Sequence, residues 1–168
     1  MLTEGPGLSE GYARVMAEAA SVCLDSQGHQ SPAALEVVER SRSEMVSLLF
    51  RAVTDDLRRN HNDENRATEM GACGVAILIC RHRLGHGVVA QAYQQEGIDY
   101  WIGDVEEGRP LNRKMRLEVS GIRCGDSADI KRRFSQKRKT TAKSDGAYPV
   151  VVMVVEFGRP QAHVEARE

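Results

Sequence analysis

The sequence lacks several features that would place it in a common functional class. Its longest apolar run, VAILIC (75–80), is far shorter than the roughly 20 residues that a membrane-spanning helix needs. The first residues, MLTEGPGLSEG, contain neither the basic segment nor the apolar segment of a signal peptide. No glycine-rich phosphate-binding loop, internal repeat or low-complexity segment is recognisable. The sequence therefore predicts a cytoplasmic protein without membrane contact.

The sequence also has no excess of either charge. It contains 23 Lys and Arg and 24 Asp and Glu, so its formal net charge is −1 at pH 7, whereas nucleic-acid-binding domains usually carry a clear basic excess. The total hides one strongly basic segment, KRRFSQKRK (131–139). The four cysteines are Cys23, Cys73, Cys80 and Cys124. None of them belongs to a C-x-x-C motif, and three of the four lie in apolar surroundings, as buried thiols do in a reducing cytoplasm.

Two helices are expected in the first half of the chain, which has 168 residues, 41% of them apolar. One runs from Glu10 to about Asp25 and is capped by Ser9. The other covers 63–82, begins at an N-cap supplied by Asp63 or the residue before it, and is apolar nearly all round beyond its first turn. A helix of that kind is buried, so it is predicted to lie in the core.

The segment between these helices allows two interpretations. ALEVVE (34–39) and MVSLLF (45–50) can form two strands joined by a polar turn and followed by a short helix at 53–59. Alternatively, a single helix runs through 31–59, because the helix propensities are nearly as good. We favour the two strands.

The second half of the chain alternates strands with one helix. A strand is expected within 85–97, and a basic amphipathic helix at 128–142, capped by Ser127 or Asp129. VVVMVVEF, within 149–157, has the continuous apolar character of a strand covered on both faces. The last residues, 161–168, are expected to form a short edge strand or a tail.

A β-hairpin between residues 97 and 123 contains the most informative pattern. GIDYWIG (97–103) and MRLEVSGIR (115–123) flank a polar, turn-rich segment. With a turn between Gly108 and Arg109, Asp99 and Glu118 are equidistant from the turn and face each other, with Cβ atoms about 5 Å apart. Two facing carboxylates repel unless a cation or a proton lies between them.

Two other interpretations of these acidic residues remain open. Acidic residues are common on exposed sheet faces, and a β-bulge in a hairpin of this length would break the register. A third acid, Glu69, enters the buried part of the helix at 63–82 without a basic partner at i+3 or i+4. It either lies on the exposed side of the helix or points toward a metal together with the hairpin acids.

The expected order helix, three strands, helix, strand over 63–157 resembles the core of the PD-(D/E)xK, or restriction-endonuclease-like, superfamily. In that superfamily an Asp begins the second core strand, the (D/E)xK pair lies on the third, and an acid of the first helix often joins them. The matching positions are Asp99, Glu118 and Glu69. Short segments also look like those of an uncharacterised bacterial protein family: ATEMGA (67–72), DYWIG (99–103) and LEVSGI (117–122).

The chain departs from the superfamily pattern at one position. Ser120 occupies the place of the Lys that positions the attacking water and stabilises charge on the phosphate. Some members supply this Lys from the following helix, for which Lys131 and Lys137 are candidates, and Gln136 matches a polar position of such helices. Without one of these groups the site would bind Mg²⁺ and cut poorly or not at all.

The resemblance implies an α/β protein with a restriction-endonuclease-like αβββαβ core and a mixed sheet, behind an N-terminal α/β extension. Residues 1–62 would form the extension and 63–168 the core of a single globular domain. The implied function is a Mg²⁺- or Mn²⁺-dependent nuclease, with a metal held by three acids, catalytic Lys131 or Lys137, and nucleic acid bound by the basic helix through Arg132, Arg133, Arg138 and Lys139.

A second interpretation is a catalytically inactive module of the same fold. Such a module would contact a partner protein through the basic helix or the N-terminal extension, and a homodimer is compatible with the sequence. The discriminating observation is whether a Lys ammonium lies within about 5 Å of the Asp99–Glu118 pair, the reach of a direct or one-water contact.

Overall fold

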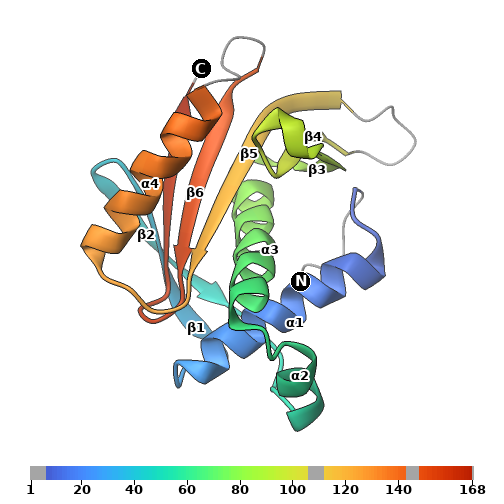
Figure 1. Ribbon diagram of the computed structural model, residues 1–168, viewed down its shortest axis with the longest axis vertical. Coiled ribbons are helices and arrows are strands. Elements are labelled where there is room, and N and C mark those ends of the chain that lie inside the picture. Colours follow the sequence, from blue (N-terminus) through green and yellow to red (C-terminus); the bar gives the residue numbers. More distant parts are fainter. Residues whose placement is uncertain (1–6, 106–111, 143–147, 168) are drawn as a thin grey trace.

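The computed structural model describes residues 7–105, 112–142 and 148–167, which form an α/β fold with four α-helices and one seven-stranded mixed sheet (Figure 1). The strand order is β2-β1-β7-β6-β5-β4-β3. The helices are α1 (Glu10–Ser26), α2 (Asp55–Asn60), α3 (Glu64–Leu84) and α4 (Ser127–Thr141). The strands are β1 (Ala33–Glu39), β2 (Arg42–Leu48), β3 (Gly87–Gln91), β4 (Tyr100–Asp104), β5 (Asn112–Ile122), β6 (Val150–Glu156) and β7 (Gln161–Arg167).

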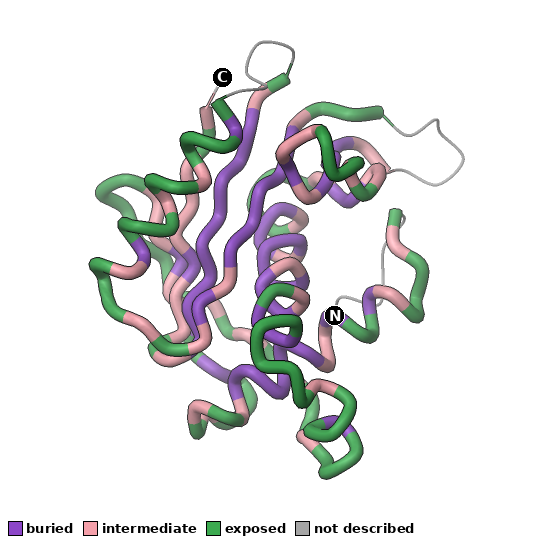
Figure 2. Tube along the Cα trace, in the orientation of Figure 1, coloured by how far each residue is buried: buried purple, intermediate pink, exposed green. Residues whose placement is uncertain are grey.

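The elements from α3 to β6 follow the predicted order of helix, three strands, helix and strand. Strands β3, β4 and β5 form an antiparallel meander, and α4 connects β5 to the parallel strand β6. Helix α3 packs on one face of β5 and β6, and α4 packs on the other face (Figure 1). Strand β6 is therefore buried along its whole length (Figure 2), as its continuous apolar sequence predicted.

The N-terminal segment extends the same sheet. The two-strand interpretation is confirmed: β1 and β2 form an antiparallel hairpin, although β2 begins three residues earlier than the apolar pattern suggested. Strand β1 pairs in parallel with β7, so the predicted edge strand at the C-terminus lies inside the sheet between β1 and β6. That prediction was wrong because the pairing joins opposite ends of the chain, which local sequence patterns do not report.

The helix termini show which polar residues cap them. Ser9 and Asp63 accept hydrogen bonds from the first-turn amides of Tyr12 and Arg66, at 3.4 and 3.1 Å, as predicted. Asp126, and not the residues expected from the sequence, caps α4 by accepting bonds from the amides of Ala128 and Asp129. The expected strand at 85–97 is shorter, because 94–96 form a 3₁₀ turn before β4.

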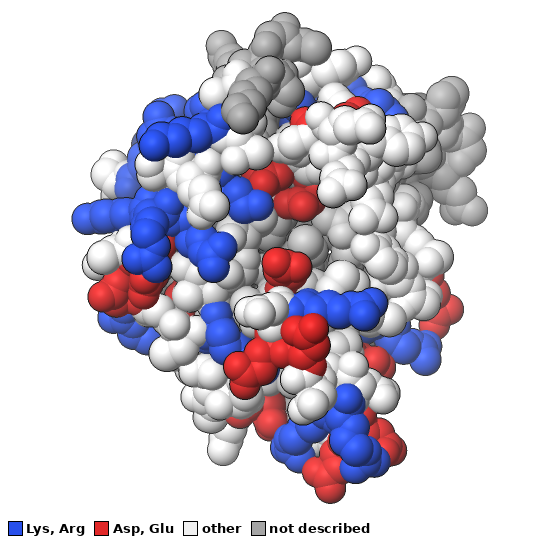
Figure 3. Space-filling view, in the orientation of Figure 1, with Lys and Arg blue, Asp and Glu red and all other residues white. Residues whose placement is uncertain are grey.

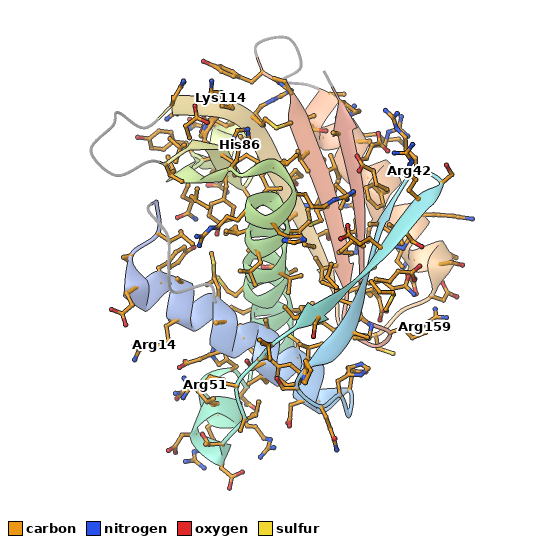
Figure 4. The ribbon with its side chains drawn as sticks, turned by 180° about the vertical axis from the view of Figure 1, so that it is seen from behind. Arg14, Arg42, Arg51, His86, Lys114 and Arg159 are labelled. Atoms are coloured by element: carbon orange, nitrogen blue, oxygen red, sulfur yellow. The ribbon has the colours of Figure 1, made fainter. Side chains whose placement is uncertain are left out.

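The core lies between α3 and the sheet and extends to α1, which packs across α3. A Cβ atom at Gly71 would lie 2.9 Å from the backbone of Ala20, so this close crossing requires glycine. Seen from behind, α1 crosses the lower end of α3, and β2 extends away from both helices toward Arg42 (Figure 4). No helix within the described residues is both long enough and apolar enough to cross a membrane.

Candidate active site at the end of strand β4

The candidate site lies where the sheet opens beside β5. Strand β4 pairs with β5 only as far as Leu117, whereas β5 continues to Ile122. Beyond that point α3 approaches the unpaired side of β5 so closely that a Cβ atom at Gly121 would lie 2.5 Å from the carbonyl oxygen of Thr68. Side chains from α3, β5 and α4 therefore meet at this notch.

Asp99 and Glu118 come together at the start of the notch. Tyr100 pairs with Leu117, so the register predicted for this end of the hairpin is present, and a bulge changes the register only after Ile102. The proposed turn between Gly108 and Arg109 lies outside the described residues. One carboxylate oxygen of Asp99 accepts the amide of Val119 at 2.7 Å, and the carboxyl groups of Asp99 and Glu118 are close enough to influence each other's protonation.

The ammonium group of Lys137 contacts this acid pair directly. Its Nζ lies 2.5 Å from Oε1 of Glu118, and the side chains of Glu118 and Lys137 are 5% and 25% exposed. Helix α4 aims Lys137 toward the sheet because Ile130 and Thr141, seven residues before it and four after it, are buried on the same side of the helix. The helix that follows β5 therefore brings an ammonium group to Glu118.

Burial and mutual repulsion shift the protonation of the two acids. Burial, followed by the negative charge of Asp99, raises the pKa of Glu118 to about 7, and the hydrogen bond and charge of Lys137 oppose this shift. Burial also raises the pKa of Asp99, against the stabilising amide of Val119. The pair therefore retains a proton more readily than exposed carboxylates do, and a cation in the notch would relieve its repulsion.

Glu69 lies beside this pair and not within it. It is exposed and lines a polar cavity of about 290 Å³ together with Ser120, Arg132 and Arg133. Among the described residues, no three His, Cys, Asp or Glu side chains are grouped closely enough to hold a metal ion. Of the three acids expected from the sequence, Asp99 and Glu118 lie together and Glu69 lies at the rim of the neighbouring cavity, so a metal site formed by all three stays a prediction.

Cys73 is a site residue that the sequence reasoning missed. It follows Glu69 by one helical turn, its thiol interacts with the side chain of Tyr100, and the charges of Asp99 and Lys137 act on it. Burial raises the pKa of the Cys73 thiol to about 12, so this side chain is an uncharged neighbour of the acid pair. The i+4 spacing from Glu69 was a signal that could have identified it.

The basic residues of α4 lie on two sides of the helix. Arg132, which pairs with Asp129 at 2.6 Å, and Arg133 face the polar cavity. Lys131, Arg138 and Lys139 instead line a groove that reaches β7, so Lys131 faces away from the acid pair. Figure 3 shows acidic side chains within the hollow beside α4 and basic side chains gathered over the helix.

No protein-family model, curated protein or solved structure matches this chain. The resemblance to the PD-(D/E)xK superfamily therefore stays a prediction, based on short motifs and on element order. What the site can do must be judged from its own residues.

The buried Glu118 and the partly buried Asp99 are suited to a hard cation such as Mg²⁺. This ion prefers oxygen ligands, keeps several waters, and is usually held by one or two protein carboxylates together with substrate phosphates. Asp99 and Glu118 meet that requirement without a third acid, and their mutual repulsion would be lowered by the ion.

Proposed function

We propose that this protein is a Mg²⁺-dependent phosphodiester hydrolase acting on nucleic acid, with a restriction-endonuclease-like core. The contact of Lys137 with the buried Glu118, beside the partly buried Asp99, carries the proposal. It brings together two acids and an ammonium group, the same side-chain types that define the PD-(D/E)xK pattern. The order of α3, three strands, α4 and β6 supports it.

Each of these side chains has a defined role in the proposed reaction. Asp99 and Glu118 would hold Mg²⁺ through carboxylate oxygens, and the bound ion supplies Lewis acidity and lowers the pKa of water. The ammonium of Lys137 would offset negative charge that develops on the scissile phosphate. Arg133, on the cavity side of α4, is placed to contact a neighbouring phosphate.

A second candidate is a catalytically silent module of the same fold. Its specific support is that the acid cluster is already satisfied without a ligand: Lys137 pairs with Glu118, and Asp99 accepts the amide of Val119. In that case the three side chains would fix α4 against β5, and the exposed cations of α4 would contact a partner protein.

Cleavage and metal titration together distinguish these candidates. Supercoiled plasmid, single-stranded DNA and RNA are incubated with the wild type and with Glu118→Gln in Mg²⁺ or Mn²⁺, while calorimetry measures metal binding to both proteins. The nuclease proposal expects metal-dependent cleavage by the wild type and loss of both cleavage and metal binding in Glu118→Gln. Metal binding that is unchanged by Glu118→Gln, or no cleavage of any substrate, contradicts it.

A further inference from the structure

A groove of about 520 Å³ runs between α4 and strand β7. Its wall on α4 carries Lys131, Ser135, Arg138 and Lys139, and His163 of β7 lies at its base. The groove is on the opposite flank of α4 from Arg132 and Arg133, which face the polar cavity beside the acid pair. The two surfaces are thus separated by the width of one helix.

Two aromatic rings form the apolar part of this groove. The rings of Phe134 and His163 meet edge to face, with centroids 6.3 Å apart. Phe134 packs against the buried side chains of Ile130 and Val154, which hold its ring in place. Both rings are only partly buried, so each has a surface that a ligand can reach.

His163 contributes a ring surface and not a charge. Burial lowers the pKa of its imidazole, so the ring is neutral at pH 7, although Glu36 opposes the shift. Its Nε2 is hydrogen-bonded to the side chain of Gln161 at 3.1 Å, which fixes the ring orientation. The groove therefore combines a rigid pair of neutral rings with cations along one rim.

Two of the three cations of the rim, Lys131 and Lys139, are available for a ligand. Lys131 and Lys139 are exposed, and within the described part of the chain neither has an ion-pair partner. Arg138 is held toward β7 by Glu165, at 3.4 Å. Lys131 and Lys139 are separated by eight residues of helix, about 12 Å at 1.5 Å per residue, so they would contact different phosphates of one strand.

We propose that this groove binds a single-stranded segment of nucleic acid, with one base stacked on the exposed face of Phe134 beside His163 and the flanking phosphates on Lys131 and Lys139. Aromatic stacking beside a basic track is the way in which proteins hold single strands, because every unpaired base has a face to offer. In a duplex these faces are stacked on neighbouring bases and cannot reach the rings.

This inference rests on the proposed function and narrows it: the substrate has a single-stranded segment that passes over α4 on the far side from the acid pair. The order of the elements allows this, because α4 exposes cations on both flanks. Single-strand binding is measurable without hydrolysis, so the two proposals are tested separately.

Fluorescence anisotropy in EDTA, with Glu118→Gln as background, measures binding of a 20-nucleotide single strand and of the matching duplex. Phe134→Leu keeps an apolar side chain but removes the stacking surface, and should weaken single-strand binding about fivefold or more, the low end of base stacking. Lys131→Gln with Lys139→Gln should lower the slope of log affinity against log salt by about 1.4, since each phosphate contact on a single strand contributes about 0.7. Arg14→Gln, which removes an exposed cation of α1 away from α4, is the matched control and should change single-strand affinity little.

A direct reporter keeps the test valid if Phe134→Leu is poorly folded. The imidazole carbon-bound protons of His163 should shift in NMR spectra when the single strand is added, because a base stacked on Phe134 lies next to the His163 ring. Three results would each overturn the proposal that the groove binds a single strand. These are unchanged His163 signals at saturation, equal affinity for duplex and single strand, and wild-type affinity of a folded Phe134→Leu variant. Groove binding with no metal-dependent cleavage by the wild type would instead refute the hydrolase while leaving the groove in place.

Discussion

The ammonium nitrogen of Lys137 on α4 lies 2.5 Å from a carboxylate oxygen of Glu118 on β5. Glu118 is just beyond the last residue of β5 that pairs with β4. The contact results from the parallel connection β5–α4–β6, which returns α4 across the face of the sheet that carries Glu118. Because Glu118 is almost fully buried and also touches Asp99, the ammonium of Lys137 is the nearest opposite charge for two acids.

Removing this cation should affect activity and stability together. Lys137→Met leaves the buried carboxylate of Glu118 without its ion-pair partner. We therefore expect a loss of roughly 1–3 kcal/mol in the free energy of unfolding at pH 8. At pH 5, where Glu118 is protonated, the loss should be smaller, because its folded pKa is about 7. Urea unfolding at both pH values measures the difference, and cleavage of nucleic acid should be abolished.

Lys131→Met is the matched control for this substitution. Lys131 belongs to the same helix but lines the groove toward β7. Its replacement should leave the stability difference between pH 5 and pH 8 unchanged. If both substitutions change this stability difference equally, the ion pair between Lys137 and Glu118 is not the cause of the pH dependence.

The stability of the wild type should fall as pH rises from about 5 to 8. The pKa of Glu118 is raised from 4.5 to about 7 on folding, so the folded state binds the proton more tightly than the unfolded state does. That contribution is complete below pH 4.5 and is lost as pH passes through about 7. The expected loss is on the order of 3 kcal/mol, at 1.36 kcal/mol for each pKa unit.

Glu118→Gln isolates this effect because glutamine does not titrate. The variant should show a flatter pH dependence in urea unfolding and should exceed the wild type in stability above pH 8. Mg²⁺ should stabilise the wild type at pH 8 but not the variant. If both proteins have the same pH profile, Glu118 does not titrate near neutrality.

Ser120→Lys restores the lysine of the superfamily pattern. Ser120 is 7% exposed and lines the polar cavity of about 290 Å³, which has room for a longer side chain beside Glu69. If Lys137 already fills the role, cleavage should change less than about threefold; if the protein is a decayed enzyme, cleavage should rise. A change in the far-ultraviolet circular dichroism spectrum would show that Ser120 is needed for packing.

The close approach of α3 to β5 should not tolerate an added methyl group. In Gly121→Ala the new Cβ atom would lie 2.5 Å from the carbonyl oxygen of Thr68, a backbone atom that cannot rotate away. Overpacking of this kind costs about 1–3 kcal/mol. In Gly11→Ala, in α1, the new methyl group meets nothing within 4 Å and should stabilise the helix by roughly 0.5–1 kcal/mol. Thermal unfolding measures the stability of both variants. Equal changes in stability would contradict the close approach of α3 to Gly121.

The sequence by itself was sufficient for features that depend on neighbouring residues. The caps at Ser9 and Asp63, the buried helix α3 and the apolar strand β6 followed from local periodicity and from hydrogen-bonding groups that lie within a few residues. The facing of Asp99 and Glu118 also followed, because both residues belong to one hairpin, whose register depends on its strand alternation and on the turn that joins its strands.

Only the tertiary structure decided which of the remaining polar residues meet. Two residues on α4, Lys131 and Lys137, were equal candidates in the sequence, and the buried anchors Ile130 and Thr141 decide which one faces the acids. Likewise, β7 joins β1 inside the sheet, and Glu69 stays at the rim of the cavity. Packing between segments distant in sequence determines these outcomes, and no local pattern encodes that packing.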